Sequence, residues 1–508
     1  MLRSPRLLAA VLAAAALASC SVAPVEGTFT DGPAATSPAP GQARWRACDD
    51  TAKEITGGQA NGKFRFSCAT VRVPQDWARP ARGTFDLALI RARSTEQGNR
   101  TGSLLVNPGG PGASGFETAV YLSYGLPAAV ARRFDLVGFD PRGVGRSTEV
   151  SCIPDRTKDE LAAADPDPVT AASFRAQLDV LRRAAAGCGR RYGARLGLFD
   201  TEQTARDLDA IRAAVGDPKT TYLGYSYGTL LGAVYAQLFP RRVRALVLDG
   251  AVDPTASPVE SSRGQAAGFE RAFDDFAADC RSRGSACPIG PDARATVNRV
   301  LAAVRARPPR ARDGREVTAG YVLTGIVASL YSQSQWTTLG RALGDLATGD
   351  GNRVLGLADE YNQRRPDGTY TNLMEANTAV TCADQARPAT IGEARRLQGE
   401  WRAQYPLFGA ALATSLLTCA VWPTTHDPYP TGPARGAPPI LVVGTTGDPA
   451  TPYENTPKLA SMLGTGVVLS WEGEGHTAYP QTTCVVRAVD AYLLELKVPG
   501  PGLHCPAR

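Results

Sequence analysis

The pentapeptide Gly224-Tyr225-Ser226-Tyr227-Gly228 has the clearest potential for chemistry in this sequence. It follows a short β-type run at 220–223 and precedes a helix-type run at 229–238. A serine on a sharp strand-to-helix turn is exposed to substrate, and its hydroxyl becomes nucleophilic when an adjacent base accepts the proton. The two glycines let the strand and the helix approach closely. G-x-S-x-G also occurs by chance in long chains, so the flanking elements carry the interpretation of Ser226 as a nucleophile.

Such a serine needs an acid and a base later in the chain, each on a turn after a late strand. Asp448 follows the strand predicted at 440–443, and His476 follows the strand predicted at 467–471. A carboxylate beside the far nitrogen of an imidazole fixes the tautomer and stabilises the imidazolium that forms during attack. We therefore predict that Ser226, Asp448 and His476 act together.

Other residues compete for the acid and base roles. Asp249 ends an earlier predicted strand and could supply the acid, and Asp448 could instead cap a helix or bond its own turn. His426 and His504 complete the three histidines of the chain. His426 lies among prolines and His504 lies near the end of the sequence, so context and chain order favour Asp448 and His476.

The oxyanion of a tetrahedral intermediate needs two backbone donors, one after the serine and one from a loop that follows an earlier strand. Tyr227 is the expected first donor. The glycine-rich loop at 107–112 follows the strand predicted at 104–106, and Gly110 is the expected second donor. The loop lacks the Lys-Ser/Thr ending of a P-loop and the spacing of a dinucleotide fingerprint. We therefore expect no nucleotide and no other cofactor.

Short apolar runs alternate with helical patterns, which is typical of a mostly parallel sheet with helices on both faces. The apolar runs near 104–106, 246–248 and 440–443 lack strict alternation, which indicates central strands buried on both faces. The predicted strands lie at 69–73, 85–92, 104–107, 134–139, 220–223, 245–248, 440–443 and 467–471.

A long insertion separates the strand ending at Asp249 from the strand beginning at Ile440. Within it Phe269, Phe273 and Phe276 recur at helical spacing, which favours core packing in a helical cap over a ligand site. The expected organisation is a lipoprotein signal peptide at 1–19, a disordered tether at 20–44, the first part of the core at 45–254, the cap at 255–435, and the C-terminal part of the core, with the acid and the base, at 436–508.

The N-terminus has the pattern of an export signal. Arg3 and Arg6 precede an apolar stretch at 7–18, which is too short to span a bilayer and is followed by Ser19 and Cys20. This segment resembles the lipobox of bacterial lipoprotein precursors, which implies cleavage before Cys20, lipidation of its thiol and anchoring on the outer face of the membrane. The alternative is a simple secretory signal with an unrelated cysteine.

The cysteine content also indicates export. Eleven cysteines minus Cys20 leave ten, which allows five disulfides. No C-x-x-C pair exists and histidines are few, so no metal site is expected. The net charge of +6 comes mostly from scattered arginines, which indicates no nucleic-acid partner. Local spacing suggests the pairs Cys48–Cys68, Cys152–Cys188, Cys280–Cys287, Cys382–Cys419 and Cys484–Cys505, while the sequence leaves the connectivity open.

Together these motifs resemble the α/β-hydrolase superfamily, and within it the prolyl-aminopeptidase branch and the secreted tripeptidyl aminopeptidases of actinobacteria. The elbow, the Gly109-Gly110-Pro111-Gly112 loop, the turn at 140–147 and the late Asp and His carry the resemblance. It runs from about residue 48 to residue 505 and includes 381–384 and a TAP-like C-terminal region. The wider branch often has His-Gly-Gly-Pro-Gly, whereas this chain has Pro108 at the first position, which argues against close kinship with single-proline-releasing enzymes. The resemblance implies triad roles for Ser226, Asp448 and His476 and oxyanion positions for Gly110 and Tyr227.

The resulting hypothesis is an exported serine exopeptidase that releases di- or tripeptides from free N-termini through an acyl-enzyme. Its peptide substrate carries an ammonium group that carboxylates must bind, and Glu260, Glu375 and Asp384 are the candidates. An envelope-associated carboxylesterase or lipase with the same triad is the alternative, because the same apparatus cleaves esters. A binding or structural lipoprotein would lack a triad member, and none is missing. The sequence leaves the oligomeric state and the physiological substrate open.

Overall fold

The computed structural model describes residues 41–59 and 61–507. The predicted signal peptide at 1–19, Cys20 and most of the predicted tether at 20–44 lie outside the described residues. Within the described part of the chain, no helix is long and apolar enough to cross a bilayer.

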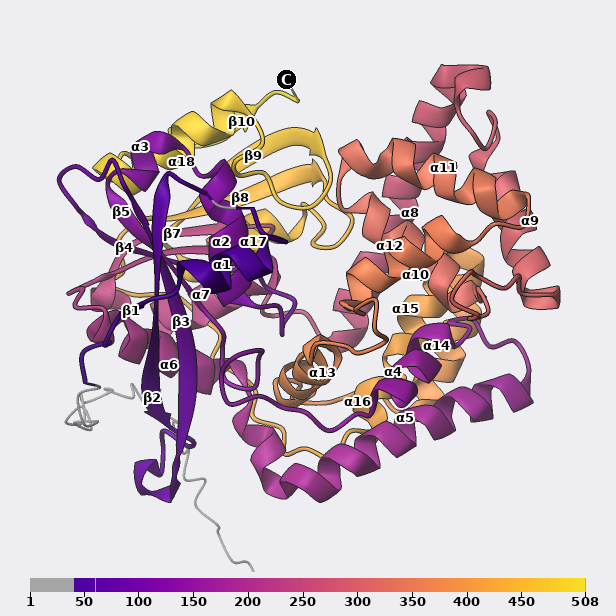
Figure 1. Ribbon diagram of the computed structural model, residues 1–508, viewed down its shortest axis with the longest axis horizontal. Coiled ribbons are helices and arrows are strands. Elements are labelled where there is room, and N and C mark those ends of the chain that lie inside the picture. Colours follow the sequence, from indigo (N-terminus) through magenta and orange to yellow (C-terminus); the bar gives the residue numbers. More distant parts are fainter. Residues whose placement is uncertain (1–40, 60, 508) are drawn as a thin grey trace, which may run out of the picture. The chain divides into compact units, whose positions relative to one another are not determined.

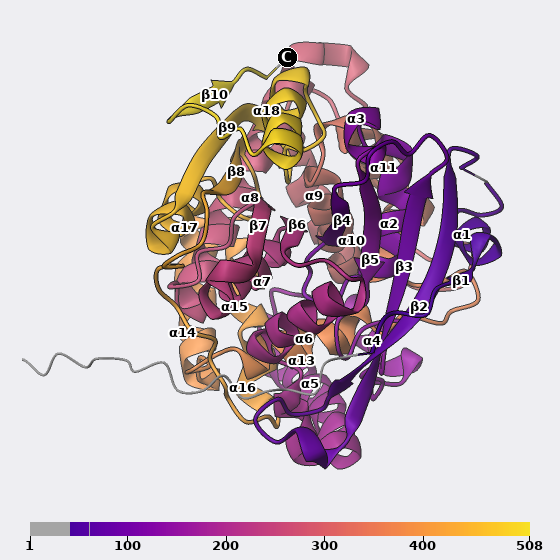
Figure 2. The same ribbon diagram turned by 90° about the vertical axis from the view of Figure 1, so that its left-hand side faces the viewer.

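One ten-stranded sheet organises the core, in the order β1-β2-β3-β5-β4-β6-β7-β8-β9-β10 (Figure 2). The pairs from β5 to β10 are parallel, and β1, β2 and β3 extend the β5 edge in antiparallel fashion. All eight predicted strands are present, and only the two short edge strands β1 and β10 were not predicted. The strands are β1 Arg46–Ala47, β2 Phe64–Pro74, β3 Thr84–Ser94, β4 Gly102–Asn107, β5 Phe134–Phe139, β6 Thr220–Tyr225, β7 Val243–Asp249, β8 Ile440–Gly447, β9 Gly466–Glu474 and β10 Leu503–Cys505.

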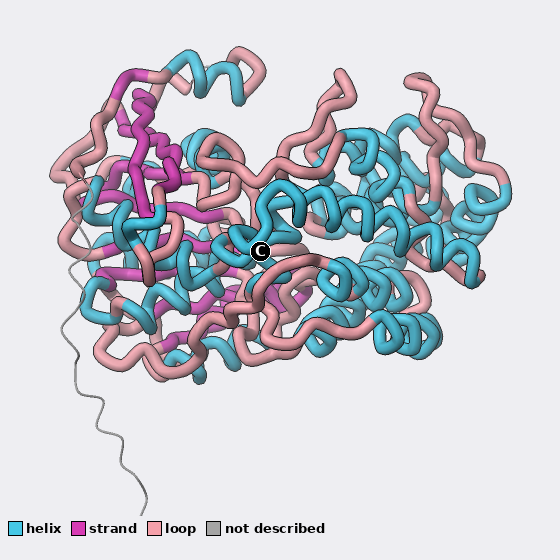
Figure 3. The backbone as a smooth tube through the Cα atoms, turned by 90° about the horizontal axis from the view of Figure 1, so that it is seen from below, coloured by secondary structure: helices cyan, strands magenta, loops and turns pink. Residues whose placement is uncertain are grey.

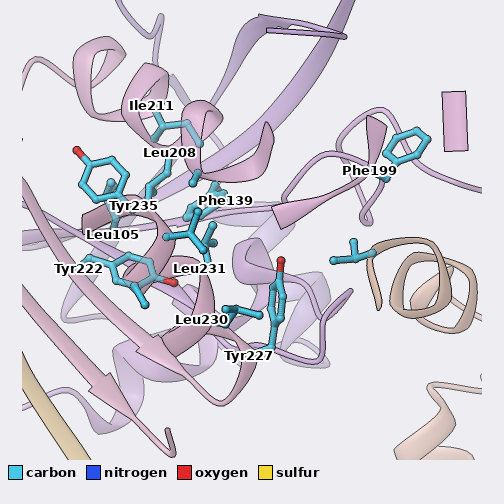
Figure 4. Close-up of a cluster of buried hydrophobic side chains, with 14 of the residues drawn as sticks. Leu105, Phe139, Phe199, Leu208, Ile211, Tyr222, Tyr227, Leu230, Leu231 and Tyr235 are labelled. Atoms are coloured by element: carbon cyan, nitrogen blue, oxygen red, sulfur yellow. The ribbon is translucent and has the colours of Figure 1, made fainter. Parts of the chain in front are cut away.

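Helices cover both faces of the sheet, as a mostly parallel sheet requires. The predicted central runs at 104–106 in β4, 246–248 in β7 and 440–443 in β8 are buried, which confirms that these strands face helices on two sides. One face packs against α2 (Gly115–Gly125), α3 (Ala128–Ala131) and α18 (Thr483–Glu495). The other packs against α6 (Thr201–Ala214), α7 (Tyr227–Leu238) and α17 (Asn455–Leu463), and Figure 4 shows part of this apolar cluster. Helix α1 (Asp49–Ile55) packs beside β2.

The chain between β7 and β8 forms a set of helices beside the sheet (Figures 1 and 3). Phe269, Phe273 and Phe276 are buried in its apolar core, as the helical spacing predicted. We call this set, together with α4 (Asp155–Ala163) and α5 (Ala171–Tyr192), the helical layer. Its members from this segment are α8 Pro258–Arg283, α9 Ala293–Ala306, α10 Ala319–Leu330, α11 Trp336–Ala347, α12 Asn352–Asn362, α13 Leu373–Ala383, α14 Ile391–Gln404, α15 Gly409–Ser415 and α16 Leu417–Val421.

Two helices that precede the serine turn in the sequence also join the helical layer. Phe174 and Leu178 of α5 (Ala171–Tyr192) share an apolar cluster with Trp401 of α14. The end of α4 (Asp155–Ala163) receives a hydrogen bond from Thr318 at the start of α10. The sequence did not indicate this packing. The remaining short elements are 3-10 helices at Pro80–Arg82, Gly193–Leu198, Pro240–Arg242, Gly284–Ala286 and Gln333–Gln335.

The structure contains the five disulfides that local spacing suggested. Two of these disulfides join elements of the core edge and of the helical layer. Cys484–Cys505 fastens α18 to the edge strand β10, and Cys382–Cys419 joins α13 to α16 within the helical layer. The pairing uses ten of the eleven cysteines, and such a disulfide set is typical of exported proteins.

Candidate active site

Ser226 lies at the sharp turn between β6 and α7, where its backbone adopts a φ of 55°. A positive φ is uncommon for a residue with a side chain and marks local strain. The turn is held by a hydrogen bond of 2.9 Å from the Ser226 N–H to the carbonyl oxygen of Asp249. A Cβ at Gly228 would lie 2.8 Å from the carbonyl oxygen of Asn107, and a Cβ at Gly224 would overlap Gly228. Both flanking positions therefore require glycine.

The glycine-rich loop after β4 packs directly on this turn. Gly109 has a φ of 94°, and a Cβ there would lie 2.6 Å from the carbonyl oxygen of Tyr225 and 2.9 Å from the Tyr227 nitrogen. Asn107 Oδ1 accepts a hydrogen bond of 3.0 Å from the Gly109 N–H. The loop that contains Gly110 thus lies beside the Tyr227 N–H, the arrangement that two oxyanion donors require.

His476 and Asp448 form a hydrogen-bonded pair. His476 Nδ1 lies 2.9 Å from Asp448 Oδ1 and 2.8 Å from Oδ2. Burial alone would lower the pKa of His476, but the charge of Asp448 and its hydrogen bond outweigh burial, so the pKa is raised above its ordinary value. His476 Nε2 is buried and has no hydrogen-bond partner among the described residues. The free nitrogen is the one that a general base uses.

The imidazole packs against the same segment that holds the serine turn. Gly250 directly follows Asp249, whose carbonyl bonds the Ser226 N–H, and a Cβ at Gly250 would lie 3.1 Å from His476 Cε1. Strands β6, β7, β8 and β9 are parallel neighbours, so their carboxyl ends share one edge of the sheet. The structure therefore brings Ser226, Asp448 and His476 to the same edge.

Thr451 is a neighbour of the acid–base pair that the sequence analysis did not single out. Its hydroxyl donates to Asp448 Oδ2 at 3.0 Å and lies 3.4 Å from His476 Nδ1. Asp448 Oδ1 also accepts the N–H groups of Ala450 and Thr451, each at 2.9 Å. The carboxylate is thus fully bonded within its own turn as well as to the imidazole, which fixes its orientation.

Helix α8 holds the Asp448 turn from outside the sheet. Arg271 donates to the carbonyl oxygen of Asp448 at 3.0 Å, and Gln265 donates to that of Ala450 at 3.0 Å. Between them, a Cβ at Gly268 would lie 2.5 Å from the carbonyl oxygen of Pro449. The positions 265, 268 and 271 lie on one side of the helix, so this part of α8 contacts the acid turn from residue 448 to residue 450.

The residue Tyr331, just after α10, holds the His476 turn in the same way. Its carbonyl oxygen accepts the His476 N–H at 2.8 Å, and Ser332 forms a β-bridge with Gly475. The ring of Tyr331 stands edge-on to the imidazole at 5.1 Å between centroids. These contacts join residues about 145 positions apart, which no local sequence signal could show.

The competing acid and histidines lie in other arrangements. The Asp249 carboxylate bonds the backbone amides of Ala478 and Tyr479 rather than the imidazole. His426 is exposed and its Nδ1 lies 3.0 Å from the carbonyl oxygen of Cys382. His504 is exposed and lies 3.7 Å from Glu472.

The three carboxylates predicted to bind an amine lie in different places. Glu260 is exposed and caps the start of α8 with Ser257. Glu375 is buried and pairs with Lys158 at 2.9 Å. Asp384 accepts hydrogen bonds from the N–H and hydroxyl of Thr201, and burial raises the pKa of Asp384 to about 7. The structure does not bring these three together.

Asp384 nevertheless connects to the serine turn. The Thr201 hydroxyl that donates to Asp384 at 2.6 Å also lies 2.5 Å from the hydroxyl of Tyr227. The side chain of Tyr227 is therefore anchored through Thr201 to the helical layer, while its N–H faces the glycine-rich loop. In Figure 4 the Tyr227 hydroxyl points away from the neighbouring Leu230.

A polar cavity of about 570 Å³ adjoins the glycine-rich loop. It is lined by Gly112 and Ser114 from the loop after β4, and by residues of the segment 363–372 after α12. Its charged lining residues are Glu117, Asp140, Arg146, Glu149, Asp155, Lys158 and Arg365. Cavities of this volume accommodate small ligands.

Known proteins resemble this chain over most of its length. A family model described as TAP-like protein matches residues 405–505. Serine protease Hip1 of Mycobacterium tuberculosis is 40% identical over 462 residues, which cover 86% of this chain and 87% of that protein. Tripeptidyl aminopeptidase of Streptomyces lividans is 33% identical over 87% of this chain and 83% of its own length. The chain belongs to the tripeptidyl-aminopeptidase-like family of α/β-hydrolases. This confirms the resemblance that the motifs indicated.

Further relatives and solved structures bear different names. Carboxylesterase B of Mycobacterium tuberculosis is 40% identical over 513 residues, which cover 97% of this chain and 95% of that protein. Among solved structures, the proline iminopeptidase of Mycobacterium smegmatis aligns at 15% identity with a TM-score of 0.36, over 84% of this chain and 98% of that one. As a member of the tripeptidyl-aminopeptidase-like family, the chain is a serine hydrolase.

Proposed function

We propose that this serine hydrolase is an exopeptidase that releases di- or tripeptides from free N-termini. The observation that carries the proposal is the buried Asp448–His476 pair at the sheet edge where Ser226 turns. The relatives named serine protease and tripeptidyl aminopeptidase support a peptide substrate. The disulfides support export.

In the proposed mechanism Ser226 Oγ attacks the scissile carbonyl carbon while His476 Nε2 takes its proton. Asp448 keeps the other ring nitrogen bonded and stabilises the imidazolium. The N–H groups of Tyr227 and Gly110 stabilise the oxyanion. His476 then protonates the leaving amine, and a water molecule activated by the same imidazole hydrolyses the acyl-enzyme and releases the short peptide.

The cavity beside the glycine-rich loop is the proposed site of the released peptide. Its volume of about 570 Å³ suits a short peptide. The carboxylates of Glu117 and Glu149 line it, and neither forms an ion pair among the described residues. We propose that these two carboxylates bind the substrate ammonium, because Glu260, Glu375 and Asp384 already have other partners.

Digestion of matched peptides tests the exopeptidase proposal. Each peptide is offered with a free and with an acetylated N-terminus, and the products are read by mass spectrometry. Free peptides should lose di- or tripeptides and acetylated peptides should stay intact, because acetylation removes the ammonium charge. Equal cleavage of both forms, or cleavage inside long peptides, would refute the exopeptidase proposal. Ser226→Ala protein is the control for contaminating peptidases.

A carboxylesterase is the second candidate, because the relative that covers 97% of this chain is named Carboxylesterase B. The same triad cleaves esters. Comparison of kcat/KM for an acyl ester and for an unblocked peptide amide decides between the two candidates. Esters are intrinsically more reactive than amides. A kcat/KM for the ester that exceeds the kcat/KM for the amide by more than this intrinsic difference would favour the esterase.

We further propose that residues 1–19 are a lipoprotein signal peptide and that lipidated Cys20 anchors the protein through the tether at 20–44. The sequence pattern at 3–20 supports this proposal. Labelling of cells with an alkyne fatty acid should tag the protein, and Cys20→Ser should abolish the tag and release the protein into the medium. A tag that persists in Cys20→Ser would exclude this anchor.

A further inference from the structure

Asp249 contacts both the serine turn and the histidine turn. It is the last residue of β7 and is fully buried. Its carbonyl oxygen accepts the Ser226 N–H at 2.9 Å. Its carboxylate accepts the Ala478 N–H at 3.0 Å and the Tyr479 N–H at 2.7 Å. One residue is thus bonded to the nucleophile by its main chain and to the segment just after His476 by its side chain.

The segment that Asp249 holds is strained. Thr477, between His476 and Ala478, has a φ of 69°. This conformation is an outlier for a β-branched residue, so it persists only where its surroundings enforce it. The N–H of His476 is held by Tyr331 on one side of Thr477, and the two amides on the other side are held by Asp249.

Asp249 also acts on His476 through its charge. The titratable groups that face its carboxylate are His476, Asp448 and Tyr225, and no Lys or Arg pairs with it within the described residues. Burial raises the pKa of Asp249 to about 7; the Tyr479 and Ala478 amides and the charge of His476 lower it, whereas the charge of Asp448 raises it. In turn, ionised Asp249 raises the pKa of His476.

We propose that Asp249 is a positioning residue of the active site, which ties the serine turn to the histidine turn through its carbonyl oxygen and its carboxylate. This inference rests on the triad roles proposed above. The proton moves only from Ser226 Oγ to His476 Nε2 and then to the leaving group. Asp448 keeps its hydrogen bond to Nδ1, and Asp249 keeps its two amide bonds throughout.

The first test is Asp249→Asn, which preserves shape but removes the charge and places an amide group against backbone donors. We expect kcat to fall roughly 10- to 100-fold, which corresponds to about 1.4–2.7 kcal/mol of transition-state stabilisation, for a peptide amide and an acyl ester alike. KM should change by less than about twofold, because the Asp249 side chain is fully buried and already bonded to backbone amides. The acid limb of kcat/KM should move to lower pH, because the imidazolium loses a neighbouring negative charge.

Asp253→Asn is the matched control. Asp253 follows four positions later, its side chain is 7% exposed, and it bonds Thr255 and Lys458 rather than the histidine turn. Its variant should keep the wild-type kcat and the wild-type acid limb. An Asp249→Asn enzyme that matches Asp253→Asn in both measurements would overturn the inference.

A second variant separates positioning from a loss of folded protein. Thr477→Gly relieves the strain at the positive φ, so Asp249→Asn should cost about tenfold less activity in the Thr477→Gly background than alone. A merely structural Asp249 would lower the active fraction without moving the acid limb, and the two substitutions would then be additive. Additivity together with an unmoved limb overturns the inference.

Ser226→Ala keeps this test distinct from the test of the proposed function. Full activity in Ser226→Ala would refute the triad itself. If Ser226→Ala is inactive but Asp249→Asn keeps the wild-type kcat and pH profile, only the role of Asp249 is refuted.

Discussion

The two sides of the candidate site are built by different means. On the nucleophile side, Ser226 and the glycine-rich loop are held by backbone contacts within the core: the bond to Asp249 and the close approach of Gly109 to Tyr225. On the acid–base side, the turns of Asp448 and His476 are held from the helical layer, by α8 and by the segment just after α10. The first side depends on local chain geometry, and the second depends on tertiary packing.

The largest effect should come from removing the proposed nucleophile. Ser226→Ala should lower kcat roughly a million-fold, as triad knock-outs do. Steady-state hydrolysis and labelling by an organophosphonate probe measure the loss. Ser282→Ala is the control, because among the described residues the Ser282 hydroxyl bonds only a carbonyl of its own helix. A loss of only tenfold would exclude Ser226 from this role.

The next effect tests whether the nucleophile side is set by backbone geometry alone. Gly109→Ala introduces a Cβ against the carbonyl oxygen of Tyr225 at a φ of 94°, so the loop must move off the serine turn. We expect a fall in kcat of about 100- to 1,000-fold, the usual result of losing an oxyanion donor. Gly125→Ala, where a Cβ meets open space, is the control. Wild-type kcat in Gly109→Ala would show that the donors lie elsewhere.

The pH profile tests the acid–base side. The charge of Asp448 raises the pKa of His476 above its ordinary value despite burial, and only the neutral imidazole accepts the serine proton. Log kcat/KM should therefore fall by about one per pH unit below a pKa higher than about 6.5. Asp448→Asn should shift this limb to lower pH while activity drops. A limb below pH 6 in the wild type would contradict the assignment.

Arg271→Ala tests the contribution of the helical layer to the acid turn. Loss of the 3.0 Å bond to the Asp448 carbonyl should lower kcat about tenfold, which corresponds to one hydrogen bond from a charged donor. Arg281→Ala on the same helix is the matched control, because Arg281 is exposed. Equal kcat in the two variants would show that α8 packs beside the triad without positioning it.

The smallest effect concerns the anchor of Tyr227. Tyr227→Phe keeps the backbone donor but removes the hydroxyl that lies 2.5 Å from Thr201. We expect about 0.5–1.5 kcal/mol less free energy of unfolding and only a few-fold lower kcat. Thermal unfolding and steady-state kinetics measure the two quantities. A loss of kcat as large as that in Gly109→Ala would place the hydroxyl in the chemistry instead.

The same contrast explains what could be predicted from the sequence. The strands, the serine turn and the glycine-rich loop follow from runs of apolar residues and from glycines at fixed spacing, which are local signals. Asp448 and His476 could be predicted because each lies just after an apolar run that predicts a strand. Other contacts join residues more than 140 positions apart: Arg271 and Gln265 with the acid turn, and Tyr331 with the histidine turn. The sequence of α5 likewise does not show which helix it packs against.

The hydrogen bonds of Asp249 show a second limit of the sequence. A carboxylate at the end of a strand is compatible with bonding an imidazole, a helix end or its own turn. Only the structure shows that its two acceptors meet the amides of Ala478 and Tyr479.

The contacts of α8 with residues 448–450 matter for any attempt to exchange substrate specificity between relatives by exchanging segments. Transplanting the helices alone would leave the recipient's acid turn facing foreign side chains, so a functional chimera must carry the turns at 448–451 and 475–479 along with the donor helices. In this architecture the helices beside the core and the two turns that they hold form one unit for exchange between relatives.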